Sequence, residues 1–123
     1  GHCTEVKSSI LLPHASCPHF NYVGDSIVGG HANLGAGSIL SNLKLTKDEV
    51  VLNISGQVYR TGLRKFGAIV GDGSQIGCNA VLNPGTLLSP HCMVYPGASI
   101  RGHFPPHTKI YLLQNQRTST SQP

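Results

Sequence analysis

Seven histidines are the side chains in this 123-residue sequence that could do the widest range of chemistry. An imidazole can move a proton near neutral pH or bind a transition metal. A metal shared between neighbouring repeats needs ligands at equivalent repeat positions. His14, His19 and His31 do not occupy equivalent positions in the six-residue repeat described below, so the sequence predicts no metal site. The others are expected to be solvent-exposed corner or tail residues: His2, His91, His103 and His107.

The four cysteines predict neither a disulfide framework nor a catalytic nucleophile. Cys17 and Cys92 fall at inward-facing repeat positions, where a thiol packs like a small apolar side chain. Cys3 and Cys78 fall elsewhere, and no CxxC pair is present. No serine or cysteine lies in an evident arrangement with a base. We therefore expect a reduced, cytoplasmic chain.

Charge and composition restrict the partners. The chain has 9 Lys+Arg and 5 Asp+Glu, a formal net charge of +4, which favours anionic ligands. Basic residues are not interleaved with aromatics, so nucleic acid is disfavoured. No apolar window is long enough to span a bilayer, so no membrane partner is expected, and the common glycine-rich phosphate loops are absent. Low aromatic content and 15 glycines favour thin, repetitive β structure.

A six-residue repeat predicts the elements that must position these groups. From residue 70 an aliphatic residue recurs at every sixth position: Val70, Ile76, Leu82, Leu88, Val94 and Ile100. A small residue follows four places after each of the first five: Ser74, Ala80, Thr86, Cys92 and Ala98. The first half repeats with occasional five-residue steps: Val6, Leu11, Cys17, Val23, Val28, Leu34 and Leu40.

This period suits a short strand and a corner, and not an α-helix, whose 3.6-residue period would spread the aliphatic residues around its axis. Three six-residue units form a triangular coil of about 18 residues, and stacked coils bury a continuous aliphatic column. The sequence therefore predicts an all-β fold, a parallel β-helix of a little over four coils.

The repeat stops between residues 44 and 65, where five of the nine basic residues lie. Residues 49–61 alternate apolar and polar types around Ser55-Gly56, which predicts an inserted β-hairpin. This insertion is either a solvated decoration or a functional loop that reaches a ligand or a neighbouring subunit.

The expected domain limits follow from the same pattern. We assign residues 1–109 to the β-helix, with 44–65 as its inserted loop, and residues 110–123 to a polar C-terminal tail. After His103 the sequence leaves the repeat. The first residues, GHCTEV, fit the end of one repeat unit and the start of the next, which is expected for a piece of a longer protein.

The repeat resembles the hexapeptide-repeat acyltransferases, whose fold is a left-handed parallel β-helix. The first forty residues resemble something narrower, the acetyltransferase part of the bifunctional enzymes that make UDP-N-acetylglucosamine (glucosamine-1-phosphate acetyltransferase and uridylyltransferase). That family has an EVK-type triplet, then H-x-x-Y-x-G-D, N-x-G-A-G and a further asparagine. Here these motifs are residues 5–7 (EVK), residues 19–25 (HFNYVGD), residues 33–37 (NLGAG) and Asn42.

The resemblance implies a role for each matching residue. His19 is the expected general base that removes a proton from the acceptor's amine, and Asn42 is expected beside the reacting groups as a fixed donor. The sugar phosphate is expected to contact four residues: Lys7, Tyr22, Asn33 and, from the Lys65-Phe66 pair after the insertion, Lys65. Ala36 and Cys78 are the expected contacts of acetyl-CoA, the co-substrate. The family also implies a homotrimer whose sites lie between adjacent prisms.

Two functions stay open at this point. The first is an acetyl-CoA-dependent N-acetyltransferase that acts on an amino-sugar 1-phosphate and forms part of a larger sugar nucleotidyltransferase. The second is a non-catalytic β-helix that trimerises or regulates an attached nucleotidyltransferase. The polar residues of the site favour the enzyme. The absence here of the family's arginine-bearing coil before Glu5, and Leu43 in place of an aromatic residue, favour the scaffold.

Overall fold

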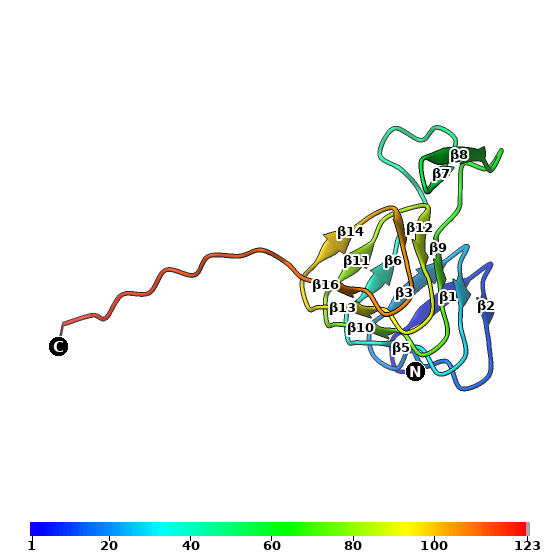
Figure 1. Ribbon diagram of the computed structural model, residues 1–123. Coiled ribbons are helices and arrows are strands. Elements are labelled where there is room, and N and C mark those ends of the chain that lie inside the picture. The colour runs from blue at the N-terminus through cyan, green and yellow to red at the C-terminus, as the bar shows by residue number, and fades with distance from the viewer. Residues whose placement is uncertain (123) are drawn as a thin grey trace.

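The computed structural model describes residues 1–122, and every regular element in that range is a β-strand. Three parallel sheets form the faces of a prism, and a two-stranded antiparallel hairpin projects from one of its corners (Figure 1). Within the described range no helix is long and apolar enough to cross a membrane. The all-β, parallel β-helix prediction is confirmed, whereas its left-handedness stays an expectation from the family.

Each face of the prism contains one strand from each successive coil. The first face is β1 (Glu5–Lys7), β3 (Tyr22–Gly24), β6 (Ile39–Leu40), β11 (Val81–Leu82) and β14 (Ser99–Ile100). The second is β2 (Ile10–Leu11), β4 (Ile27–Val28), β9 (Ala68–Val70), β12 (Thr86–Leu88) and β15 (His103–Phe104). The third is β5 (Asn33–Leu34), β10 (Gln75–Ile76), β13 (Met93–Val94) and β16 (Lys109–Ile110), with Ser16 bridged to Asn33 at its start.

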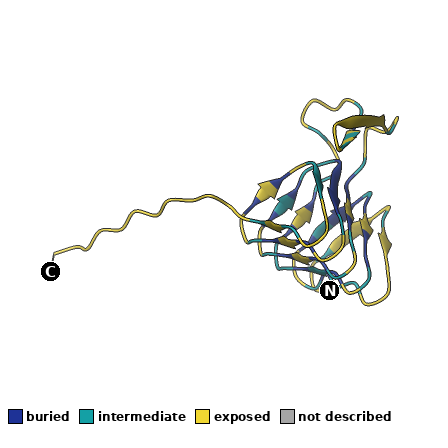
Figure 2. Cartoon of the chain, viewed as in Figure 1, coloured by how far each residue is buried: buried dark blue, intermediate teal, exposed yellow. Residues whose placement is uncertain are grey.

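The predicted aliphatic column is the core. In-register pairs such as Leu40 with Leu82, and Leu82 with Ile100, stack the inward side chains of consecutive coils. Leu34, Leu40 and Leu82 are 0% exposed, and the small residues at the turns are buried with them. Figure 2 shows buried residues in every inner coil of the prism, alternating with exposed or partly exposed ones along the strands. The repeat therefore identified the inward positions correctly.

The first coil departs from the prediction that its aliphatic residues are buried. Val6 and Leu11 belong to the column by their pairing with Val23 and Val28, yet they are 43% and 39% exposed. Each inner coil is covered on both sides, whereas in residues 1–122 the first coil has a neighbour on one side only. Burial in this fold comes from the adjacent coils, so the outermost one stays partly open.

The coil also continues beyond the point at which we predicted that the repeat ends. β15 and β16 follow Ile100 and complete another turn, with the inward residues Phe104 and Ile110 packed against the core. The step from Ile100 to Phe104 is four residues, and its inward residue is aromatic. A search for aliphatic residues at six-residue steps therefore misses this turn.

Three corners join the faces, and each is formed by residues with a positive φ. We name them by one residue each. The Asn42 corner lies between the first and second faces, the His31 corner between the second and third, and the His19 corner between the third and first. The φ angles are 47° at Asp25, 58° at His31 and 52° at Phe20. This left-handed backbone conformation supplies the sharp bend between short strands.

The inserted loop leaves the prism at the Asn42 corner. It contains β7 (Val51–Ile54) and β8 (Gln57–Arg60), joined at Ser55-Gly56 as predicted. The loop returns beside its starting point, because Leu43 and Lys65 form an antiparallel bridge. Figure 1 shows the hairpin outside the prism, next to the ends of the strands at this corner. The residues after β16 form a tail without strands that extends away from the prism. The insertion therefore decorates one corner and leaves the core intact.

Candidate active site

A hydrogen-bonded cluster of polar side chains occupies the Asn42 corner. The side-chain Nδ2 of Asn42 donates to Oδ2 of Asp25 at 2.6 Å and to the hydroxyl of Tyr22 at 3.1 Å. These bonds form because Tyr22 pairs with Ile39, and Val23 with Leu40, which sets the coil of Asn42 beside that of Asp25. Asn42 is 9% exposed. The cluster is therefore fixed in place by the parallel register and by burial.

Gly24 makes this cluster possible. A Cβ at Gly24 would lie 2.6 Å from Nδ2 of Asn42 and 2.7 Å from Cε2 of Tyr22. Either side chain would have to move away, and the bond between them would break. The glycine of the HFNYVGD motif is therefore required by close approach, and not by its backbone angle.

The cluster changes what Asn42 can offer a ligand. Its two N–H groups are directed to Tyr22 and Asp25, so its carbonyl oxygen Oδ1 is the group left free to accept a bond. The Tyr22 hydroxyl accepts the bond from Asn42, which leaves its own hydrogen available to donate. At this corner the hydrogen-bond donor that is free to contact a ligand is therefore the Tyr22 hydroxyl, and not the Asn42 amide that we expected.

Two lysines flank the cluster. Lys7 pairs with Gly24 on the first face, so it lies one coil before the cluster. Lys65 lies at the root of the insertion and lines a cleft of about 260 Å³ that also includes Asp25. Neither lysine has an ion-pair partner among residues 1–122. The two lysines outnumber the single carboxylate of the cluster, Asp25, and the net positive charge suits an anionic group.

The His19 corner brings together a second set of predicted residues. Backbone hydrogen bonds run from Gly37 to His19, from Asn79 to Ala36 and from Gly97 to Cys78, which align these residues on successive coils. His19, Ala36 and Cys78 therefore form one column, although they are far apart in the sequence. Ala36 and Cys78 have small side chains, and Cys78 is exposed.

Asn21 is a functional candidate that the sequence analysis missed. Its Oδ1 accepts the backbone N–H of His19 at 3.2 Å, and its Nδ2 donates to Gly35 O at 2.8 Å and to Ser38 Oγ at 3.0 Å. Asn21 is 3% exposed. Asn21 thus links the His19 backbone to the next coil and fixes the backbone position from which the His19 side chain extends. An asparagine inside the motif HFNYVGD was the available signal, since asparagine side chains commonly bond to nearby backbone at turns.

The candidate residues do not form one group within a single chain. Lys7, Tyr22, Asn42 and Lys65 gather at the Asn42 corner, while His19, Ala36 and Cys78 lie at the His19 corner. Asn33 stands on the third face, paired with Gln75. His19 and Asp25 are six residue steps apart, a stretch that includes β3 and spans at most roughly 20 Å. His19, the predicted general base, and the Asn42 cluster thus occupy opposite edges of the first face.

Two pairs of histidines stack at the His31 corner, contrary to the spacing predicted from the sequence. We predicted that His14 and His31 do not occupy equivalent positions, but their rings stack with centroids 4.7 Å apart at the His31 corner. His91 and His107 stack at the same corner with centroids 5.2 Å apart. The first coils contain five-residue steps, so counting in sixes misaligned them. Within residues 1–122, no three His, Cys, Asp or Glu side chains gather to hold a metal ion.

All four cysteines have free thiols in the structure. Cys17 and Cys92 are buried, as their repeat positions predicted, and Cys3 and Cys78 are exposed.

Comparison with known proteins gave no match to a family model. A bifunctional sugar-1-phosphate nucleotidylyltransferase/acetyltransferase from Sulfurisphaera tokodaii is 36% identical over 81% of this chain and 25% of its own length. The bifunctional protein GlmU of Methanococcus vannielii is 37% identical over 76% of this chain and 24% of its own length. This chain therefore spans about a quarter of the curated relatives that it matches.

A solved structure, a mutant of GDP-perosamine N-acetyl transferase from Caulobacter crescentus in complex with CoA and GDP-perosamine, also matches. It is 14% identical and aligns with a TM-score of 0.32, covering 85% of this chain and 52% of that chain.

Proposed function

Since this chain is a hexapeptide-repeat β-helix homologous to about a quarter of the bifunctional sugar-1-phosphate nucleotidylyltransferase/acetyltransferases, we propose that it performs acetyl transfer. The reaction is N-acetylation of an amino-sugar 1-phosphate with acetyl-CoA as the co-substrate. The observation that carries the proposal is the Asn42 cluster, in which Tyr22 and Asn42 are locked together between two unpaired lysines.

The sugar phosphate binds at the Asn42 corner. Lys7 and Lys65 supply the positive charge, and the Tyr22 hydroxyl donates to a phosphate oxygen because it accepts its other bond from Asn42. The free Oδ1 of Asn42 accepts a hydrogen from the acceptor's amine or hydroxyl groups. Asp25 fixes the Asn42 amide and is a positioning residue in this scheme.

His19 accepts the proton as the amine attacks. The amine nitrogen forms a bond to the thioester carbonyl carbon, the imidazole takes the proton from that nitrogen, and the carbon–sulfur bond then breaks. The departing sulfur recovers a proton, so no covalent intermediate with the protein is needed. Acetyl-CoA lies along the column of Ala36 and Cys78, where the small side chains leave room for a thin chain.

Both corners are needed, so the active unit is an assembly of copies of this chain, a homotrimer. In a three-fold arrangement of prisms, the face turned toward the axis has its two edges beside the neighbouring prisms. The Asn42 and His19 corners are the two edges of the first face. With that face toward the axis, the Asn42 corner of one copy lies against the His19 corner of the next. Asn33, on the third face beside the His19 corner, then faces the same crevice.

A cytoplasmic location belongs to this proposal. Both ligands are intracellular metabolites by their chemistry, and the exposed thiols of Cys3 and Cys78 are compatible with a reducing compartment.

The test is coenzyme A release from acetyl-CoA with a panel of amino-sugar 1-phosphates. The reaction is monitored by the loss of absorbance of the thioester bond. That readout avoids thiol reagents, which the exposed Cys3 and Cys78 would consume. We expect turnover that depends on one amino sugar and is lost in His19→Ala. His107→Ala is the matched control, because it removes an exposed imidazole from a different corner.

Two results would contradict the proposal. Normal turnover in His19→Ala would mean that another group is the base. No turnover with any acceptor, in a preparation that forms trimers, would support the scaffold function instead.

A further inference from the structure

The His31 corner carries a column of histidines, one on every coil except the middle one. Each of them has a φ between 58° and 65°, and every one is exposed: His14, His31, His91 and His107. Gly73 takes the equivalent position on the middle coil, with a φ of 68°. The positive φ fixes the direction in which each side chain leaves the backbone. Imidazoles on adjacent coils are therefore brought together.

The column consists of two stacked pairs. The His14 and His31 rings have centroids 4.7 Å apart, and the His91 and His107 rings have centroids 5.2 Å apart. Gly73 separates the pairs, and a Cβ on it would lie 2.5 Å from the His91 Nδ1. The first pair joins the first coil to the second, and the other pair joins the last coil, which contains β15 and β16, to the coil before it. Each terminal coil is thus attached at this corner through one stacked pair.

The backbone hydrogen bonds between coils at this corner are longer where the histidines stack. The His31 and His107 amides donate to the preceding coil at 3.2 Å and 3.1 Å. The Gly73 and His91 amides donate at 2.9 Å and 2.8 Å. Within residues 1–122 each terminal coil is also covered on one side only. Local opening is therefore expected to begin at the two coils that the histidine pairs attach.

Little opposite charge balances the imidazoles. The corner segments contain one carboxylate, Asp72, whose Oδ1 accepts a backbone N–H of the second coil at 2.8 Å. In the part of the chain that the structure describes, Asp72 forms no ion pair with any of the four histidines. The other titratable groups beside the corner are the buried Cys92 thiol, His103 on the second face and Lys109 on the third. Protonation of both rings in a pair therefore leaves two positive charges facing each other.

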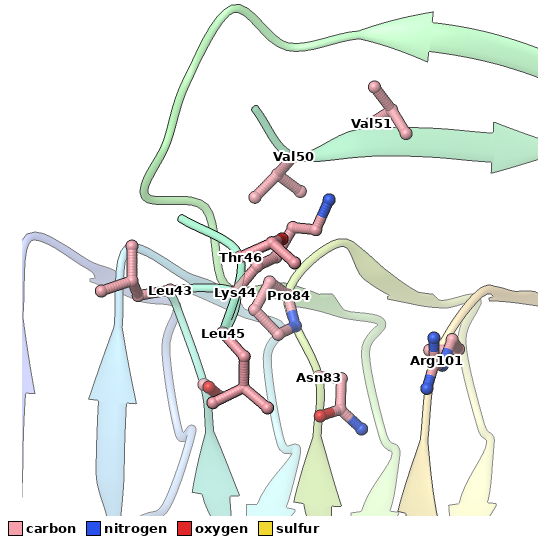
Figure 3. Close-up of a pocket in the computed structure, with 10 residues that line it drawn as sticks. Leu43, Lys44, Leu45, Thr46, Val50, Val51, Asn83, Pro84 and Arg101 are labelled. Carbon is pink, nitrogen blue, oxygen red and sulfur yellow. The ribbon is translucent and has the colours of Figure 1, made fainter. Parts of the chain in front are cut away.

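The corner lies apart from the chemistry proposed above. It is opposite the first face, so in the proposed trimer it points away from the axis and its histidines stay in contact with solvent. A cleft of about 570 Å³ at the root of the insertion, which includes Lys44 and Arg101 (Figure 3), contains none of its residues. The smaller cleft beside Lys65 contains none of them either.

We propose that the His31 corner is a pH-sensitive switch, which holds both terminal coils while its imidazoles are neutral and releases them in mild acid. When a terminal coil opens, the two rings of its pair separate, so their repulsion exists only in the closed state. Imidazoles gain protons between about pH 8 and pH 5. The closed state therefore loses stability as the pH falls through this range and regains it as the pH rises. The middle coil carries Gly73 and takes no part.

Release of the first coil has a consequence for the candidate active site. The first coil carries Lys7, which pairs with Gly24 beside the Asn42 cluster. Opening moves this lysine away from the cluster, so mild acid is expected to weaken binding of the sugar phosphate. This consequence rests on the proposed function, whereas the release of the coil does not.

Hydrogen exchange at single amides of the whole chain tests the switch, at about pH 7.5 and about pH 5.5, where imidazoles titrate and most carboxylates do not. The protection factor, the intrinsic exchange rate divided by the observed one, measures the opening of a coil. We expect the protection of the His31 and His107 amides to fall about fivefold in acid, the effect of two unit charges at this spacing in water. Protection of the Gly73 amide is expected to stay the same. Salt at about 1 M is expected to reduce the fall, because it screens the repulsion.

Replacing one ring of each pair gives matched variants. Asparagine accepts a positive φ, so His14→Asn and His91→Asn each remove one imidazole and keep the backbone of the corner. His14→Asn is expected to abolish the acid response of the His31 amide and to leave that of the His107 amide. His91→Asn is expected to do the reverse, so each variant is the control for the other.

Three results would overturn the switch: unchanged protection of the His31 and His107 amides in acid, an equal fall at the Gly73 amide, or an acid response of the His31 amide that survives in His14→Asn. Thermal unfolding of His14→Asn at neutral pH must match that of the unsubstituted chain. If it does not, His31→Asn removes the other ring of the pair, and the amide of residue 31 is measured under the same criteria. The measurement uses no acetyl-CoA and no sugar phosphate, so failure of the acetyl-transfer proposal is seen separately.

Discussion

The side-chain amide of Asn42 donates a 2.6 Å hydrogen bond to Oδ2 of Asp25, on the coil before it, although 17 positions separate the two residues. The same amide also donates to Tyr22. One carboxylate thus determines which way the Asn42 amide points. If the Asn42 corner binds the acceptor sugar, the orientation of this amide controls the reaction without Asp25 touching the substrate.

Asp25→Asn is therefore expected to lower kcat more than it raises KM. A hydrogen bond to a charged group contributes about 1.5–3 kcal/mol, so turnover falls about 10- to 100-fold while the fold is kept. Steady-state coenzyme A release and thermal unfolding measure the two effects. Unchanged kcat in Asp25→Asn would remove Asp25 from its positioning role, and Asp72→Asn is the control for losing a carboxylate at another corner.

The proposed assembly predicts which face is covered. Val81 points outward from the first face, where it pairs with Ile39, so Val81→Lys places a charge between copies and is expected to give monomers without turnover. Ile69→Lys makes the same kind of change on the second face, where Ile69 is 37% exposed, and is expected to leave the assembly intact. Sedimentation velocity distinguishes them. Dissociation by Ile69→Lys alone would place the interface on the second face.

Stability depends on position along the column. Leu82 is 0% exposed between two coils, so Leu82→Ala leaves a cavity and is expected to lower the free energy of unfolding by about 2–5 kcal/mol. Val6 is 43% exposed on the first coil, and Val6→Ala is expected to cost less than about 1 kcal/mol. Denaturant unfolding at one fixed protein concentration measures both, because assembly makes stability concentration-dependent. Equal losses would mean that the first coil is as well packed as the fourth.

The insertion is expected to loosen in acid. Arg60 donates two hydrogen bonds to Oε1 of Glu49 and lowers the pKa of that carboxyl below its ordinary value of 4.5, and the Gly62 N–H adds to the effect. A carboxyl whose pKa is lower in the folded chain stabilises that state above its ordinary pKa, and this contribution is lost as the pH falls through the lowered value. Hydrogen exchange at the Gly62 amide is therefore expected to quicken below pH 4.5 relative to the neighbouring corners. In Glu49→Gln the Gly62 amide is expected to exchange fast even at neutral pH. Slow exchange of this amide at neutral pH would show that Glu49 does not hold the loop.

The column, the hairpin and the inward thiols could be predicted from the sequence alone. Each depends on the local chain: a six-residue period fixes which side chain points inward, as for Leu82, and an apolar–polar alternation around Ser55-Gly56 fixes a hairpin. The resemblance in residues 5–42 singled out the polar residues in the same way, because a motif is a short stretch of chain.

The grouping of those residues was decided by tertiary structure. His19 and Asn42 lie at opposite edges of one face, His14 stacks on His31, and Lys44 and Arg101 share a cleft although 57 positions separate them. These relationships depend on the number of residues in each coil, and one five-residue step changes which side chains lie at the same corner. The sequence by itself determined which way each side chain faces, since that is set within one strand. Only the stacking of coils decided which side chains are neighbours, since that depends on the summed length of the chain between them.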